Sequence, residues 1–354
     1  MTLCWPLFLA LLCGAALTCT AATTSPAREA EQQMAQLTKK PGRYAATEAR
    51  SHWYNFFIRP AKENPGDQLA YAEKLRQDGR LRAAGKQFRL LTVFWPQAPE
   101  ASKAQLAYAR VLDLRKQRNE WWTSWEDAFN EYVYLIEHYP GTFNYNEILQ
   151  RMFELAETVM ATRKGKFLII PGFKTPERAI PLFEKILEHG PEWEQAPTCQ
   201  FYIGRAHEAS FEYELAIAAY LTTIVRYPTS PCAEQAAYHR ALCLENLATS
   251  SPNNEATLDE AWTAMHQFAA RYPKSEHLIE VTKLRDDLQR RRARLAYDRA
   301  HYYDAIAKKP KAAALEYQEF VRAFPQSDWT AEAQKRIEQL APLVAKEEHD
   351  QAKP

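Results

Sequence analysis

His207 and Glu208 are the residues whose types and spacing come nearest to a catalytic motif. They begin a pattern like H-E-x-x-H, in which two histidines one helical turn apart bind zinc and the glutamate acts as a general base. The fifth position is Phe211, so the second zinc ligand is missing. The sequence also has no glycine-rich phosphate-binding loop and no G-x-S-x-G motif. We therefore expect no catalytic residue, no metal site, no cofactor and no enzyme activity.

The three cysteines in the predicted array could be free thiols or could form a disulfide bond. Cys199, Cys232 and Cys243 lie in predicted helices, and their spacing matches no zinc-binding pattern. Cys232 and Cys243 are eleven residues apart on one predicted helix, which is too far for a disulfide bond. We expect these three thiols to be buried and free, with a disulfide as the alternative.

The N-terminal segment, residues 1–22, has the composition of a secretory signal peptide. It is almost wholly apolar from Leu3 to Leu17 and carries no charge before Arg28, and it is too short for a comfortable membrane span. Cys19 lies near its end. Bacterial lipoproteins are cleaved before a cysteine that then carries the lipid, so Cys19 is a candidate lipid-attachment site. Ordinary cleavage after Ala21 or Ala22 is the alternative.

Three consecutive arginines, Arg290, Arg291 and Arg292, form the most basic run of the chain. They fall in a stretch from Leu278 to Ile306 that has few helix breakers and is predicted to be one long helix. The run is either a solvated helix face or a charged ridge that binds a partner protein. The formal net charge of the whole chain is only +1, which argues against a nucleic-acid partner.

A repeat organises the elements that must position these residues. Six prolines recur, each with an alanine twelve residues before it and a large side chain eight residues before it. The prolines are Pro96, Pro140, Pro191, Pro228, Pro273 and Pro325; the alanines are Ala84, Ala128, Ala179, Ala216, Ala261 and Ala313; the large residues are Phe88, Tyr132, Phe183, Tyr220, Met265 and Tyr317. The alanine and the large residue share one helix face, and the proline ends that helix. Thr142, Ser230, Ser275 and Ser327, two residues after a proline, are candidate N-caps of the next helix.

The unit from Ala196 to Pro228 is the most complete. Its Gly204, Ala216, Tyr220 and Pro228 have the spacing of the tetratricopeptide repeat, a helix–turn–helix unit. We predict an all-α fold, a tetratricopeptide-like solenoid of about six helix pairs with a C-terminal capping helix. Arrays of this kind bury their apolar faces only between neighbouring units and mostly bind other proteins.

The repeat divides the chain into five regions. We predict a signal peptide at 1–22, a lead-in and N-terminal cap at 23–65, an array at 66–345 with halves 66–195 and 196–345, and a disordered tail at 346–354. We expect the apolar cluster Trp53–Ile58 to belong to this cap; the alternative is that the cluster contacts a partner protein. Trp121, Trp122 and Trp125 are expected to pack a joint between helices, with a binding hot spot as the alternative. Lys164–Pro176 is a non-helical insertion that either folds over the array or presents a docking edge.

The C-terminal part resembles a known family. The run KLRDDLQRRRARLAYDRAHYY, the helix Ala312–Phe320 and the junction Ala323–Ser327 resemble the outer-membrane assembly lipoprotein BamD. That family has an arginine-rich long helix with paired tyrosines at its end, then a helix of the form A-x-x-x-Y-x-x-F. Its recurrent R-Y-P-x-S junctions are matched at Arg226–Ser230 and Arg271–Ser275. The resemblance is clearest over 196–340.

This resemblance implies a periplasmic scaffold of the machinery that inserts β-barrel proteins into the outer membrane. In the family, a lipid holds the array at the membrane, and the C-terminal half contacts the barrel component. The N-terminal half receives unfolded barrel clients. We therefore expect an exported protein, associated with the outer membrane only through a lipid on Cys19. Arg290, Arg291 and Arg292 would then belong to the partner-binding surface. The alternative is another periplasmic repeat adaptor, such as a coordinator of envelope constriction in the Tol system.

Overall fold

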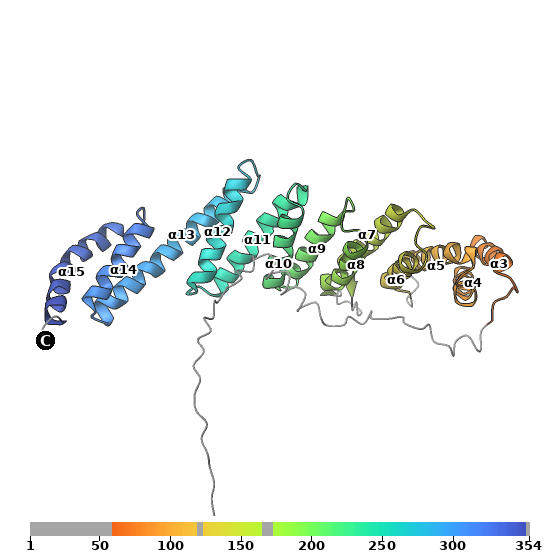
Figure 1. Ribbon diagram of the computed structural model, residues 1–354, viewed down its shortest axis with the longest axis horizontal. Coiled ribbons are helices and arrows are strands. Elements are labelled where there is room, and N and C mark those ends of the chain that lie inside the picture. Colours follow the sequence, from red (N-terminus) through yellow and green to blue (C-terminus); the bar gives the residue numbers. More distant parts are fainter. Residues whose placement is uncertain (1–58, 119–122, 165–172, 352–354) are drawn as a thin grey trace, which may run out of the picture. The chain divides into compact units, whose positions relative to one another are not determined.

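The computed structural model describes residues 59–118, 123–164 and 173–351. Thirteen α-helices occur in these ranges, and each packs against the next one along the chain (Figure 1). The α-helices are α3 (Pro65–Gln77), α4 (Leu81–Phe94), α5 (Pro99–Gln117), α6 (Trp125–His138), α7 (Tyr145–Ala161), α8 (Ile180–His189), α9 (Ala196–Ala209), α10 (Tyr213–Arg226), α11 (Pro231–Ser250), α12 (Glu255–Arg271), α13 (Leu278–His301), α14 (Pro310–Ala323) and α15 (Thr330–Gln351). Six antiparallel pairs, α3–α4 to α13–α14, are followed by α15, which confirms the predicted repeat solenoid and its capping helix.

The repeat residues form the interior of these pairs. All six alanines have no exposed surface, and the six large residues are at most 2 % exposed. Gly204 shows why small residues are needed there, because a Cβ at this position would lie 2.5 Å from the Tyr220 ring. The sequence spacing therefore identified the packing face of the second helix, although Ala179 of the third pair lies in the 3₁₀ turn that precedes α8.

Each repeat proline ends the second helix of its pair in the same way. The six residues that precede the prolines have φ between −133° and −121° and ψ between 49° and 64°, outside the helical region. Their amides still donate to the carbonyl four residues earlier. The steric demand of the proline ring on the preceding residue accounts for this common geometry.

The expected N-caps are only partly present. Ser230 caps α11 and accepts a hydrogen bond from the Cys232 amide at 3.2 Å. Thr142 is not a cap: its hydroxyl donates to the Tyr139 carbonyl, and Asn144 begins α7 instead. Ser275 and Ser327 accept from the amide two residues on within a turn, and their helices begin later. These corrections have one cause, since the turns after Pro140, Pro273 and Pro325 are longer than the turn after Pro228.

The predicted long helix extends from Leu278 to Ile306, as α13 followed by a π-helical turn, η2 (Tyr302–Ile306). Its first half packs through Val281 and Leu288 into the cluster built around α12. Its second half packs through Ala293 and Ala300 into a separate cluster with α14 and α15. One helix therefore links two apolar cores, and this explains its unusual length.

The insertion and the C-terminus differ in detail from their predicted forms. Two short antiparallel strands, β1 (Arg163–Lys164) and β2 (Phe173–Lys174), pair at the base of the insertion, and a 3₁₀ turn, η1 (Pro176–Ala179), leads into α8. The predicted disordered tail from residue 346 is wrong as far as Gln351, because α15 continues to that residue. Lys311 of α14 forms an exposed ion pair with Glu348 of this extension at 3.0 Å.

Candidate functional site: polar surfaces of the helical array

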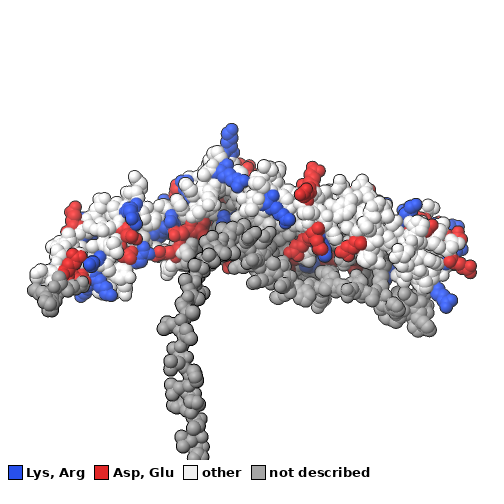
Figure 2. Space-filling view, viewed as in Figure 1, with Lys and Arg blue, Asp and Glu red and all other residues white. Residues whose placement is uncertain are grey.

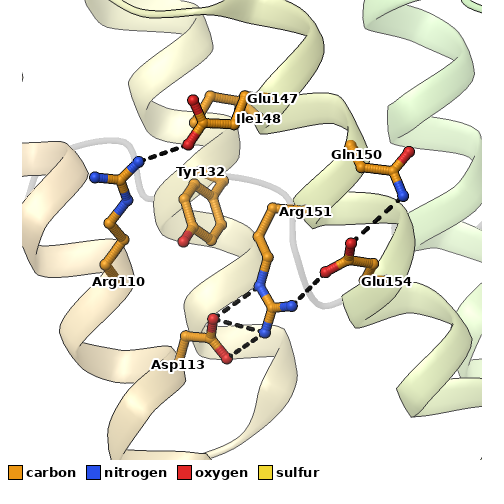
Figure 3. A pocket seen from close by; sticks show the side chains of 8 residues that line it. All are labelled: Arg110, Asp113, Tyr132, Glu147, Ile148, Gln150, Arg151 and Glu154. Atoms are coloured by element: carbon orange, nitrogen blue, oxygen red, sulfur yellow. Dashed lines mark hydrogen bonds and ion pairs between the residues drawn. The ribbon is translucent and has the colours of Figure 1, made fainter.

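A polar pocket of about 270 Å³ lies over the α5–α6–α7 joint (Figure 3). Its lining residues are Arg110, Asp113, Tyr132, Glu147, Ile148, Gln150, Arg151 and Glu154. Asp113 of α5 receives two hydrogen bonds from the Arg151 guanidinium of α7, at 2.7 and 2.8 Å. The same guanidinium pairs with Glu154. On the rim, Arg110 and Glu147 form a more exposed pair at 2.7 Å.

The charged groups of this pocket pair with one another and connect neighbouring helices. The Asp113 side chain is only 9 % exposed, and the bidentate contact with Arg151 compensates for the burial of this carboxylate. Burial, and next the charge of Asp113, raise the pKa of Tyr132 to about 12, which keeps the phenol protonated at the floor. Every charged group among the eight lining residues has a partner of opposite sign. The arrangement fixes α5 against α7 and offers no free acid, base or nucleophile.

A second polar cluster joins α9 and α10 to α11. The Tyr220 hydroxyl donates to Glu208 at 2.5 Å, and His239 of α11 lies 3.1 Å from the same carboxylate. Burial raises the pKa of Glu208, but the hydrogen bonds from His239 and Tyr220 outweigh it and hold the pKa below its usual value. His207 faces elsewhere, with its Nδ1 2.8 Å from Glu212. The candidate pair His207–Glu208 therefore does not converge on one site.

The three arginines of the basic run point to different neighbours. Arg290 is exposed and pairs with Asp287 on its own helix. Arg291 donates to the Ala248 carbonyl at the end of α11 at 2.6 Å. Arg292 bonds to Asp259 at 2.5 Å, and its guanidinium lies 4.6 Å from the Trp262 ring centroid. The run therefore divides into one solvent-facing arginine and two that tie α13 to α11 and α12.

Other candidate groups of the sequence have more ordinary surroundings. Cys199, Cys232 and Cys243 are free thiols, and Cys199 and Cys243 are buried. Trp125 is half-buried and packs against the core, as expected of a joint residue. Cys19, Trp121, Trp122 and the cluster Trp53–Ile58 lie outside the described residues.

Neither a metal site nor a membrane span is evident in the part of the chain that the structure describes. No group of three or more His, Cys, Asp or Glu side chains in these ranges is arranged to hold a metal ion. None of the described helices combines the length and the apolar character that crossing a bilayer requires. On the face shown in Figure 2, positive and negative side chains are interspersed, without a continuous basic stripe.

One family model matches part of the chain. Residues 174–315 match the model of YfiO, an outer membrane lipoprotein family. This segment extends from the end of the insertion into α14 and includes the Arg290–Arg292 run, so it supports the resemblance to the BamD family over the C-terminal part. No curated protein sequence matches the chain.

Two solved helical proteins align with most of this chain, at low sequence identity and low TM-score. A tetratricopeptide repeat protein from Parabacteroides merdae shares 14 % identity at a TM-score of 0.27, over 77 % of this chain and 98 % of its own. The assembly chaperone of RpL4 (Acl4) shares 12 % identity at a TM-score of 0.24, over 82 % of this chain and 100 % of its own.

One set of structural residues was missed at the sequence level. Gln68, Gln105 and Gln200 are buried on first helices, and each donates to a backbone carbonyl of the second helix. The acceptor always directly precedes the large repeat residue: Gln87, Glu131 and Ala219. A glutamine twenty residues before Phe88 and Tyr220 was the available signal. Gln105 does not show this spacing from Tyr132, because the connection between α5 and α6 is longer.

Proposed function

We propose that the protein is a non-catalytic scaffold of the machinery that assembles β-barrel proteins in the outer membrane. The observation that carries this proposal is the match of residues 174–315 to an outer membrane lipoprotein family. The stacked helix pairs support it, since such arrays act by presenting surfaces to other proteins. In this proposal residues 1–22 direct export, a lipid on Cys19 holds the chain at the outer membrane, and the barrel component is the main partner.

The outward face of α13 is the surface that we propose for docking. Arg290 and Arg294 point to solvent with side chains 70 % and 72 % exposed. Their acidic partners, Asp287 and Asp298, lie on the same helix. Exposed pairs of this kind contribute only about 0.3–0.5 kcal/mol, so a carboxylate on a partner can replace them at little cost. We therefore infer an acidic patch on the partner. Arg291 and Arg292 support this face from behind by fixing α13 to its neighbours.

Affinity capture from envelope extracts tests this proposal. The full chain should retain a β-barrel assembly component, and the double variant Arg290→Glu, Arg294→Glu should retain much less. Arg322→Glu is the matched control, because this arginine is 80 % exposed on α14 and also pairs within its own helix. Circular dichroism spectra of all variants should be unchanged. Equal capture by the double variant would remove α13 from the interface.

The identity of the captured protein separates the two candidate functions. Recovery of a Tol-system component in place of a barrel assembly component would favour the envelope-constriction adaptor. Binding of unfolded barrel clients, which we assign to the array half at 66–195, is tested separately by crosslinking with a denatured barrel protein. A crosslink confined to 196–345 would contradict that assignment.

A further inference from the structure

Three units share one unusual backbone position in the turn between their two helices. Gly79, Phe211 and Lys308 have φ of 74°, 61° and 51°, in the left-handed region. Each lies five residues before a repeat alanine, so the three positions are equivalent. Glycine adopts this conformation freely, whereas a side chain with a Cβ is strained there. Gly79 is the residue that the turn favours, and a bulky aromatic at Phe211 needs another explanation.

The Phe211 side chain contributes little to the packing of the array. It is 77 % exposed, and its ring centroid lies 6.3 Å from that of Tyr213, with the two rings edge-on. The turn around it is fixed on both sides: the Phe211 amide donates to the Glu208 carbonyl, and the Glu212 amide donates to the His207 carbonyl. The His207 ring also contacts the Glu212 carboxylate. A rigid turn therefore holds an apolar ring out into solvent.

The surroundings of this ring are acidic. Glu212 and Glu214 lie within three residues of Phe211 and are both exposed, whereas Glu208 is already paired with Arg205 and His239. Ser210 donates to the exposed Glu177 at 3.2 Å and so brings a further carboxylate to the turn. An anionic lipid surface would be repelled here. A protein segment with positive charges would be attracted.

We propose that Phe211 anchors a second docking site, for a protein segment in which an apolar side chain is flanked by lysine or arginine. The ring supplies apolar contact area, and the surrounding glutamates select a basic partner. The site lies on the turn between α9 and α10. It involves none of the arginines on α13, so its test is independent of the test of the docking face proposed above.

Two glycine variants of the full chain test this site. Phe211→Gly relieves the strained backbone and removes the ring, while Lys308→Gly relieves the equivalent strain without removing an aromatic. Both should keep or raise the Tm, by roughly 1–3 °C. The probe is a short fluorescein-labelled peptide of alternating leucine and lysine, followed by fluorescence anisotropy. Phe211→Gly should weaken binding at least about tenfold. Lys308→Gly should leave it unchanged, and Phe211→Trp should retain it.

Several results would overturn the proposal. One is failure of the unchanged chain to bind the leucine–lysine peptide. Another is equal binding of a leucine–glutamate peptide. The same holds if Phe211→Gly binds the peptide like the unchanged chain, or if Lys308→Gly loses as much affinity as Phe211→Gly. Binding to phosphatidylglycerol vesicles that depends on Phe211 would assign the ring to a lipid surface instead.

Discussion

Replacing Gly204 with alanine should destabilise the joint between α9 and α10. The added Cβ would lie 2.5, 2.6 and 3.0 Å from three atoms of the Tyr220 ring, closer than any van der Waals contact allows. This ring has no room to move away. It is fully buried, its centroid is 5.7 Å from those of both Phe201 and His239, and its hydroxyl is bonded to Glu208.

The magnitude follows from two opposing effects. Overpacking a core costs about 1–3 kcal/mol, and a clash with a ring held on several sides belongs at the upper end. Alanine in place of glycine within a helix contributes about 1 kcal/mol in the other direction. The expected net loss for Gly204→Ala is about 2 kcal/mol.

Gly85→Ala is the matched control, because it makes the same exchange within α4 with only one tight contact, 3.3 Å to a Val111 methyl. We expect its stability to equal or exceed that of the unchanged chain, by up to about 1 kcal/mol. Urea unfolding followed by circular dichroism at 222 nm measures both variants. A Gly204→Ala chain that unfolds at the same urea concentration as the unchanged chain would refute this account of how the helix pairs pack.

Three further predictions concern other parts of the chain. The hydrogen bonds from Arg336, at 2.5 and 2.8 Å, hold the pKa of Asp304 below its usual value of 3.8. The ion pair therefore stabilises the fold above pH 3.8, and this contribution is lost as the pH falls through the lower folded pKa. The loss of resistance to urea between pH 7 and pH 3 should therefore be smaller in Asp304→Asn than in the unchanged chain. Arg292→Ala should cost about 1–2 kcal/mol in urea unfolding, because it removes the contacts with Trp262 and Asp259, whereas Arg290→Ala should stay within about 0.5 kcal/mol. Cys19→Ala should release the protein from membranes in cell fractionation, and unchanged partitioning would indicate cleavage after the alanines at 21 and 22.

Local sequence rules were sufficient for the second helices of the array. The alanine, the large residue and the proline lie within twelve positions, so their shared face and the helix end follow from helix geometry alone. The bounds of the long helix at Leu278 and Ile306 were also predictable, because no breaker interrupts it. Helix starts were harder, since Thr142 and Asn144 are both good caps and the length of the turn decides between them.

Contacts between residues far apart in the chain could not be predicted from the sequence patterns. Asp113 and Arg151 are thirty-eight residues apart, and their pairing depends on how α5 and α7 align. The same limit applies to the basic run. Its helical character was predictable, but Arg292 is held by Asp259, thirty-three residues earlier, and Arg290 only by its own helix. The ion pair between Lys311 and Glu348 in the extension of α15 likewise joins residues far apart in the sequence.

The central claim is that this chain is a scaffold for β-barrel assembly, and depletion in the cell that produces it is the most direct test. The measurement is the amount of folded β-barrel protein in the outer membrane, read by its heat-modifiable migration in gels as the chain is depleted. The account predicts that folded barrels decline and unfolded barrel proteins accumulate, and that expression of the unchanged chain restores both. Normal levels of folded barrels after complete depletion would contradict it.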